Sequence, residues 1–171
     1  PADGGVGCPI LPDQGPSVGH HDDDARNNLW RTNMITGHCE CGRIQFDIDG
    51  QIRDFSHCHC SQCRRMHGAA YASFVGVSRD DVHFQFGESD LTTYRSSTTG
   101  QRTFCSTCGS NIYVALDTEP DVLYVAMGVI DGNPSLPSAH HIYVGSKAPW
   151  HEIDDGLRQY DKAPQDEKNE A

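Results

Sequence analysis

Seven of the eight cysteines in this 171-residue chain stand in three short clusters, and the spacing within each cluster is typical of metal ligands. Two clusters are pairs separated by one or two residues and followed directly by a glycine: Cys39 with Cys41, and Cys105 with Cys108. Such a turn lets two thiolates converge on one cation, and the glycine accommodates the positive φ that the turn often needs. The two pairs together predict one closed, structural zinc site that ties distant strands together and contributes binding energy directly to folding.

The remaining cluster places Cys58, Cys60 and Cys63 within six residues. Structural zinc sites are normally closed by four ligands, whereas catalytic sites keep one position for water or substrate. An open zinc can acidify a bound water or thiol and polarise a carbonyl group as a Lewis acid. Three thiolates leave the centre with a formal single negative charge, which suits the binding and exchange of a sulfur ligand. We therefore predict two zinc ions per chain, a structural one on the first four cysteines and a catalytic one on these three.

Two alternative interpretations of the cysteines stay open. Eight is an even number, which allows a disulfide framework, but Cys-x-Cys neighbours are poorly placed to bridge each other and no secretion signal is visible. In the second alternative, a histidine completes the three-cysteine site and makes it purely structural; the candidates are His57, His59 and His67. Cys8 lies far from the clusters and is predicted to be a bystander thiol.

The elements that must position these clusters are predicted to be short β-strands. Apolar residues alternate with polar ones at 44–48 and 82–86, which is typical of strands with one buried face. Further strands are predicted at 71–77, 91–94, 111–116, 122–127 and 141–144. The helical signal amounts to a turn or two after Cys60 and near 154–159. We expect a mainly β domain whose loops carry the metal ligands.

Composition restricts the domain organisation and the partners. We expect a Gly/Pro-rich, acidic arm over 1–33, one folded domain over 34–162, and a flexible charged tail over 163–171. The net charge of −11 at pH 7 argues against broad electrostatic binding to nucleic acid or anionic lipid. No window approaches the ~18 apolar residues that a membrane-spanning helix needs. The absence of a visible signal peptide, together with metal-bound thiols, predicts a cytoplasmic protein.

The order of the three clusters resembles the glutathione-dependent formaldehyde-activating enzyme family, which also contains the centromere protein V-like proteins. The matching stretches are Gly-His-Cys-Glu-Cys-Gly at 37–42, Cys-His-Cys-Ser-Gln-Cys-Arg-Arg at 58–65 and Phe-Cys-Ser-Thr-Cys-Gly-Ser at 104–110. Weaker matches follow at 141–142 and 147–150, so the resemblance covers about 35–160. It implies an Mss4-like fold of packed antiparallel sheets, with the structural and catalytic zincs on the cysteines assigned above.

The resemblance also implies glutathione chemistry, in which formaldehyde and the glutathione thiol form S-hydroxymethylglutathione. Centromere protein V-like members carry an additional basic, proline-rich region that this chain lacks, so a chromatin role is not expected. The acidic arm of this chain matches nothing in the family pattern.

The leading functional hypothesis is a zinc-dependent carbon–sulfur lyase or transferase acting on an adduct of an aldehyde and a small thiol, glutathione. Arg64 and Arg65 are candidates to anchor a substrate carboxylate, because arginine presents a forked set of donors; surface solvation or a bond to a loop carbonyl is the alternative. Arg102 and Lys147 are weaker candidates for that role. His141 is a candidate proton relay, with a packed strand histidine as the alternative.

Two other classes of function stay open. A hydrolase using zinc-bound water would turn over an imine or another carbonyl-derived substrate without added thiol. A non-catalytic binding module, comparable to the Mss4 proteins that bind small GTPases, would use both zincs for structure alone. The three-cysteine cluster argues against such a module, which would not need an unsaturated second zinc. The oligomeric state cannot be predicted from this sequence.

Overall fold

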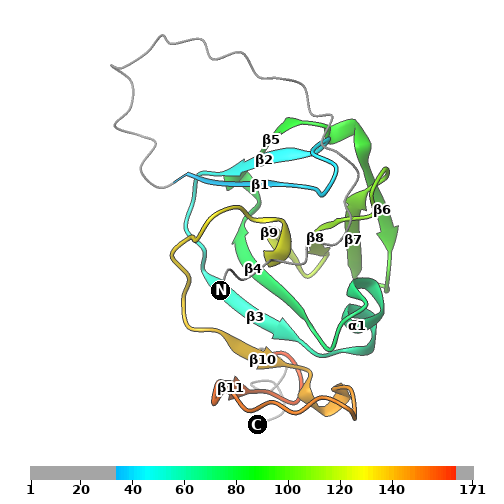
Figure 1. Cartoon of the computed structure of the whole chain (residues 1–171), viewed down its shortest axis with the longest axis vertical. Helices are drawn as coiled ribbons and strands as arrows, with labels where there is room; N and C mark the ends of the chain where they lie inside the picture. The colour runs from blue at the N-terminus through cyan, green and yellow to red at the C-terminus, as the bar shows by residue number, and fades with distance from the viewer. Residues whose placement is uncertain (1–33, 165–171) are drawn as a thin grey trace, which may run out of the picture.

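The computed structural model describes residues 34–164, which form two β-sheets and one short α-helix (Figure 1). The smaller sheet has the order β1-β2-β5, with β1 (Ile35–His38), β2 (Gln45–Ile48) and β5 (Val82–Phe86). The larger sheet has the order β11-β10-β3-β4-β9-β8-β7-β6. Its strands are β3 (Asp54–Cys58), β4 (Ala72–Ser78), β6 (Leu91–Arg95), β7 (Gly100–Cys105), β8 (Asn111–Leu116), β9 (Glu119–Ala126), β10 (His140–Ile142) and β11 (Arg158–Gln159).

The two faces of the larger sheet have different roles, because successive side chains along a strand point to opposite faces. One face packs against the smaller sheet and forms the main core, where Val75, Val125 and Phe46 are almost completely buried. The alternate residues, including Phe74 of β4 and Tyr124 of β9, point to the opposite face and line a cavity. The same sheet therefore provides both the core and the walls of a candidate site.

The expected fold class is confirmed: the described part of the chain is mainly β, and most strand pairs are antiparallel. One edge of the larger sheet differs, because β10 pairs in parallel with both β3 and β11. Parallel neighbours need a crossover connection, which the long segment between β9 and β10 supplies. This pairing places Ile142 opposite Cys58 at the end of β3.

The helix expected after Cys60 is confirmed as α1 (Ser61–His67). Cys60 caps its N-terminus by accepting a hydrogen bond from the Cys63 backbone N–H, and Gly68 ends it in the left-handed region. The helical turns expected near 154–159 are wrong: Gly156 has a φ of 72°, and the chain then enters β11. The strand expected at 141–144 ends at Ile142.

The sequence did not predict β1, β3 or β7 as strands. The strand β3 carries Asp54 and Ser56 where its side chains face the cavity, and β7 carries Arg102 in the same way. Polar residues at these positions remove the clean alternation on which a strand prediction depends.

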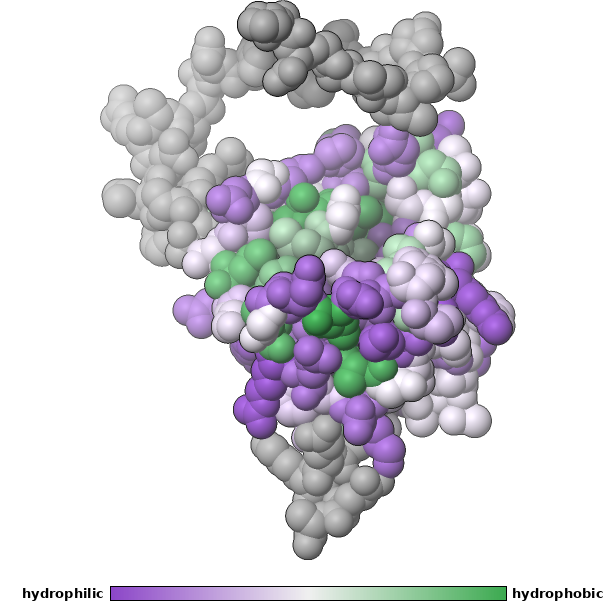
Figure 2. Space-filling model, turned by 60° about the horizontal axis from the view of Figure 1, so that its bottom comes forward, coloured by the Kyte–Doolittle hydropathy of each residue, from purple (hydrophilic) through white to green (hydrophobic). Residues whose placement is uncertain are grey.

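Hydrophilic residues cover much of the face seen in Figure 2, and apolar residues show between them in patches. Among residues 34–164, no helix has the length and apolar character needed to cross a membrane. The predicted arm over 1–33, with Cys8, lies outside the described residues, as does most of the predicted tail.

Candidate metal centres and cavity

The first group of sulfurs, the four-cysteine group, joins the turn after β1 to the turn after β7; its members are Cys39, Cys41, Cys105 and Cys108. All four sulfur atoms lie within 4.8 Å of one another. The Sγ atoms of Cys39 and Cys41 are 3.5 Å apart, and those of Cys41 and Cys105 are 3.8 Å apart. Tetrahedral zinc with bonds of about 2.3 Å to sulfur separates its sulfurs by about 3.8 Å, so this donor set fits zinc.

Local backbone geometry holds the two turns of the four-cysteine group in place. Gly42 and Gly109, which follow the two pairs, have φ values of 70° and 77°, so the expected positive φ is confirmed. The Ile44 backbone N–H donates to Cys39 Sγ at 3.3 Å. The Glu40 backbone N–H donates to Ser110 Oγ at 3.0 Å and links the two turns directly. Cys39 and Cys105 are fully buried in the main core, so the four-cysteine group lies where the two sheets meet.

The second group of sulfurs, the three-cysteine group, lies where β3 passes into α1. Cys58 is the last residue of β3, Cys60 caps α1, and Cys63 lies inside α1. Their sulfur atoms lie within 4.8 Å of one another, and Cys58 and Cys63 are almost fully buried. Hydrogen bonds from the thiols of Cys58 and Cys63 lower the pKa of Cys60. Three soft sulfur donors fit a zinc ion that keeps one position free.

No disulfide joins the seven cysteines of the described chain, whose sulfurs form these two groups instead. Within residues 34–164, no histidine, aspartate or glutamate joins the three-cysteine group within 4.8 Å. His57 contacts Ser73 Oγ through Nδ1 at 2.9 Å, and His59 contacts His141. The Nε2 atom of His67 is buried without a hydrogen-bond partner, and its ring packs edge-on against Phe74.

A cavity of about 690 Å³ opens beside the three-cysteine group. This cavity distinguishes the three-cysteine group from the four-cysteine group. All three cysteines of the former line the cavity, and none of the latter does. Its apolar wall includes Phe74, Val114 and Ile142 from three strands. Its ionisable lining, apart from the cysteines, consists of Asp54, Arg102, Glu119, Tyr124, His140 and Tyr143. A cavity of this size with few polar groups is typical of a small-molecule site.

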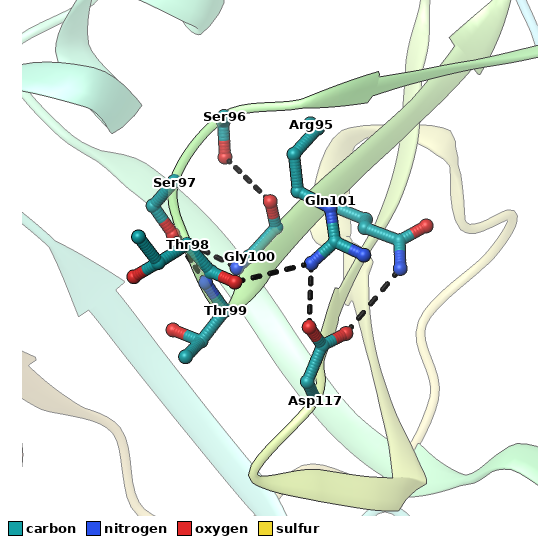
Figure 3. A network of polar contacts seen from close by, with 8 residues as sticks. All are labelled: Arg95, Ser96, Ser97, Thr98, Thr99, Gly100, Gln101 and Asp117. Atoms are coloured by element: carbon teal, nitrogen blue, oxygen red, sulfur yellow. Dashed lines mark hydrogen bonds and ion pairs between the residues drawn. The ribbon is translucent and has the colours of Figure 1, made fainter.

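The loop between β6 and β7 forms one rim of the cavity, to which it contributes Ser97 and Thr99 (Figure 3). Ser97 Oγ accepts hydrogen bonds from the backbone N–H of Gly100 at 2.8 Å and of Thr99 at 3.3 Å. At the base of the loop, Arg95 forms an ion pair with Asp117 (Figure 3). On the other side, the Gln62 side chain of α1 donates to the Ser96 carbonyl at 2.8 Å. The rim is thereby tied to the helix that carries Cys63.

Arg102 of β7 lines the cavity and contacts the three-cysteine group directly. Its side chain is only 6% exposed, and its Nη2 donates to Cys63 Sγ at 3.4 Å. Its Nε and Nη1 atoms are buried and have no hydrogen-bond partner. Arg102 is only a weaker candidate from the sequence. Its contact with Cys63 joins residues 39 positions apart and depends on how β7 packs against α1, which the sequence does not show.

The structure places Arg64, Arg65 and Lys147 away from the cavity lining. Arg64 donates to the backbone carbonyls of His59 at 3.3 Å and Ser146 at 3.2 Å. Lys147 donates to the His151 carbonyl at 3.0 Å, and Arg65 is exposed. Substrate anchoring by these three residues therefore has no geometric support in this structure.

His141 lies on the face of β10 opposite the cavity, at the centre of a hydrogen-bonded chain. Its Nδ1 lies 2.8 Å from His59 Nε2, and its Nε2 lies 2.9 Å from Asp155 Oδ2. His141 is 1% exposed and does not line the cavity, whereas its neighbour His140 does. The chain links the C-terminal segment to His59, which stands between two members of the three-cysteine group.

We expect the free energy of unfolding to fall as the pH is lowered from 6.5 toward 4. Burial lowers the pKa of His59 from 6.5 to about 4, and burial also lowers the pKa of His57. In this range the unfolded chain binds protons that the folded chain does not, so stability decreases with decreasing pH. Urea unfolding at pH 7 and pH 5, with bound metal counted at each pH, measures the effect.

A His57→Asn variant should show a weaker pH dependence of stability, because it removes a partly buried imidazole whose pKa is lowered by burial. The matched control is His83→Asn, which removes a half-exposed imidazole of β5 instead. Equal stability of the native chain at pH 7 and pH 5, with its metal retained, would contradict the expectation.

The fold and the two cysteine groups define a β-rich protein equipped to bind metal at one closed group and one group open to a cavity. The family model described as "Glutathione-dependent formaldehyde-activating enzyme" matches residues 34–146, and the chain belongs to this family. The resemblance of the three cysteine clusters to that family is thereby confirmed.

Two curated proteins are similar to this chain in sequence. A Halomonas elongata protein, provisionally named a glutathione-dependent formaldehyde-activating enzyme, is 28% identical over 71% of this chain and 82% of its own length. An uncharacterized lyase of Schizosaccharomyces pombe is 28% identical over 65% of this chain and 79% of its own length. A crystal structure of a Rhodobacter sphaeroides protein shares the fold, with a TM-score of 0.51 and 23% identity over 73% of this chain and 98% of the other.

Proposed function

We propose that this chain is a zinc-dependent carbon–sulfur lyase or transferase that joins glutathione to formaldehyde and cleaves the resulting adduct. One observation carries the proposal: the three-cysteine group lines the cavity, whereas the four-cysteine group lies between the sheets. A zinc ion on Cys58, Cys60 and Cys63 would supply positive charge next to the reacting sulfur and carbonyl oxygen. The four-cysteine group would hold a second, structural zinc.

The reaction forms one carbon–sulfur bond and needs no oxidant or reductant. The thiol sulfur bonds to the carbonyl carbon, the π electrons of the carbonyl bond move to oxygen, and the proton from sulfur ends on that oxygen. The cavity contributes positioning and partial exclusion of water, because Phe74, Val114 and Ile142 provide apolar walls.

The cavity lining carries charged side chains that bear on the binding of glutathione. Arg102 is a permanent cation beside the three-cysteine group, while Asp54 and Glu119 are carboxylates on the cavity lining. Glutathione carries one ammonium group, for which Asp54 and Glu119 are counterparts, whereas the charge of Arg102 faces the sulfurs. The Tyr124 hydroxyl donates to Glu119 at 2.6 Å and fixes the direction of that carboxylate.

Calorimetric titration of reduced glutathione into the fully zinc-loaded chain tests the choice of thiol. We expect binding in the range from about micromolar to millimolar Kd that small metabolites commonly show. This binding should disappear in a Cys60→Ser variant and persist in Cys8→Ser, which changes a cysteine outside both groups. Absence of binding with both groups loaded would contradict the assignment of glutathione.

Chelation should remove the two metal ions in two stages. The three-cysteine group offers fewer ligands and opens to a cavity, so its metal should leave first, while the closed group retains its own. We expect formaldehyde–glutathione turnover to be lost at the first stage and the far-ultraviolet circular dichroism only at the second. Simultaneous loss of both ions and of the fold would contradict this division of roles.

A further inference from the structure

Arg102 is a buried cation whose surroundings contain no carboxylate partner. Among residues 34–164, the single hydrogen bond of its side chain goes to Cys63 Sγ at 3.4 Å, and the Nε and Nη1 atoms of that side chain have no partner. Its strand neighbours in register are Tyr94 and Val114, neither of which carries a negative charge. An unpaired charge buried in this way is strongly unfavourable unless another charge compensates it. The compensating charge must therefore come from the sulfurs that Arg102 contacts.

The charge of a metal-loaded three-cysteine group is of the right sign and size to balance Arg102. Three thiolates and one divalent cation carry a single net negative charge, and the guanidinium brings the assembly to neutrality. His67 adds no charge to this balance, because burial and the neighbouring Arg102 both lower its pKa. The four-cysteine group is built differently, because two of its cysteines, Cys41 and Cys108, are exposed to solvent.

We propose that Arg102 is the positioning residue that allows the three-cysteine group to accept a further anionic sulfur ligand, the thiolate of the substrate. With Arg102, the assembly passes from neutral to a single negative charge when a thiolate arrives. Without it, the assembly would pass from one negative charge to two inside a partly buried cavity. Arg102 acts through Cys63, so it sets the affinity of the site for metal and for thiolate. The identity of the thiolate as substrate rests on the proposed function, whereas the effect on the metal does not.

The test compares Arg102→Met, which removes the charge, with Arg102→Lys, which keeps it. The matched control is Arg95→Met, which changes a half-exposed arginine at the base of the rim loop (Figure 3). Circular dichroism and metal retained by the four-cysteine group establish that each variant is folded. Each chain is then loaded with Co²⁺ at the three-cysteine group, and its affinity is measured by competition with a chelator.

We expect Arg102→Met to bind Co²⁺ about 10- to 100-fold more weakly, as is typical when a residue supporting a metal ligand is removed. The sulfur-to-cobalt charge-transfer band should move to longer wavelength, because the hydrogen bond and the positive charge lower the energy of the sulfur electrons. Arg102→Lys should recover much of the affinity, and Arg95→Met should match the native chain. Unchanged affinity and an unchanged band in Arg102→Met would overturn the proposal.

The thiolate part of the proposal is tested with 2-mercaptoethanol, which has no carboxylate. Its binding to the cobalt-loaded group should weaken at least tenfold in Arg102→Met at saturating metal, which excludes the loss of a carboxylate anchor as the cause. Equal binding by the native chain and Arg102→Met would overturn this part. If the native chain binds 2-mercaptoethanol but does not process formaldehyde and glutathione, the proposed function fails while the role of Arg102 stands.

Discussion

A Cys39→Ser chain is expected to lose its folded structure, or to keep it only at temperatures far below those tolerated by the native chain. Cys39 is fully buried in the main core and belongs to the group that joins the two sheets. Structural zinc binding contributes about 10–16 kcal/mol in zinc-finger peptides, which is as large as the roughly 5–15 kcal/mol that stabilises a typical domain. Loss of one of the four ligands is therefore expected to lower the free energy of unfolding of the whole domain by a large amount. Thermal unfolding followed by circular dichroism, together with a zinc count, measures the loss.

The matched variant Cys41→Ser separates metal binding from packing. Cys41 is exposed, so exchanging its sulfur for oxygen should cost little in packing, yet it removes a ligand from the same group. We expect Cys41→Ser to be strongly destabilised as well, and to respond less than the native chain to added zinc. A Cys41→Ser chain as stable as the native one would contradict a structural role for the four-cysteine group.

A Cys60→Ser chain is expected to stay folded and to lose its activity on formaldehyde and glutathione, with bound zinc falling from two ions per chain to one. Cys60 lies on the cavity wall and supplies one of only three sulfurs. Serine is a good helix cap, so its hydroxyl can replace the sulfur as acceptor for the Cys63 backbone N–H and preserve α1. Zinc content, circular dichroism and turnover are measured on the same sample.

The outcome of Cys60→Ser also separates the three classes of function. Collapse of the fold would show that the three-cysteine group is structural, as a binding module requires. Full activity with a single bound zinc would contradict a catalytic role for this group. The Cys8→Ser chain is the control for the loss of a cysteine that belongs to none of the three sequence clusters.

The three-cysteine group and the two pairs of the four-cysteine group could be predicted from the sequence because the spacing within each cluster is local. Strands with one clearly apolar face, such as β2, could be predicted for the same reason. The strand β3 could not, because its alternate residues face the cavity and are polar. Had β3 been recognised, its period of two would have placed Asp54 and Ser56 beside Cys58 on the cavity wall.

The residues around the cavity depend on contacts between distant segments, which one sequence does not reveal. Arg64 and Arg65 directly follow Cys63, yet Arg64 is bonded to backbone carbonyls and Arg65 is exposed. Arg102 reaches Cys63 because β7 lies beside α1. His141 is directed away from the cavity because of the register between β10 and β3, which places it opposite His57.

The central claim is that the three-cysteine group carries out thiol–aldehyde chemistry in the cavity. Exchange spectroscopy by NMR on an equilibrated mixture of glutathione and formaldehyde measures the rate at which S-hydroxymethylglutathione forms and breaks down. We predict that the zinc-loaded chain accelerates this exchange and that Cys60→Ser, at equal concentration and folded, leaves it at the uncatalysed rate. An uncatalysed rate with the native chain, carrying metal in both cysteine groups, would contradict the claim.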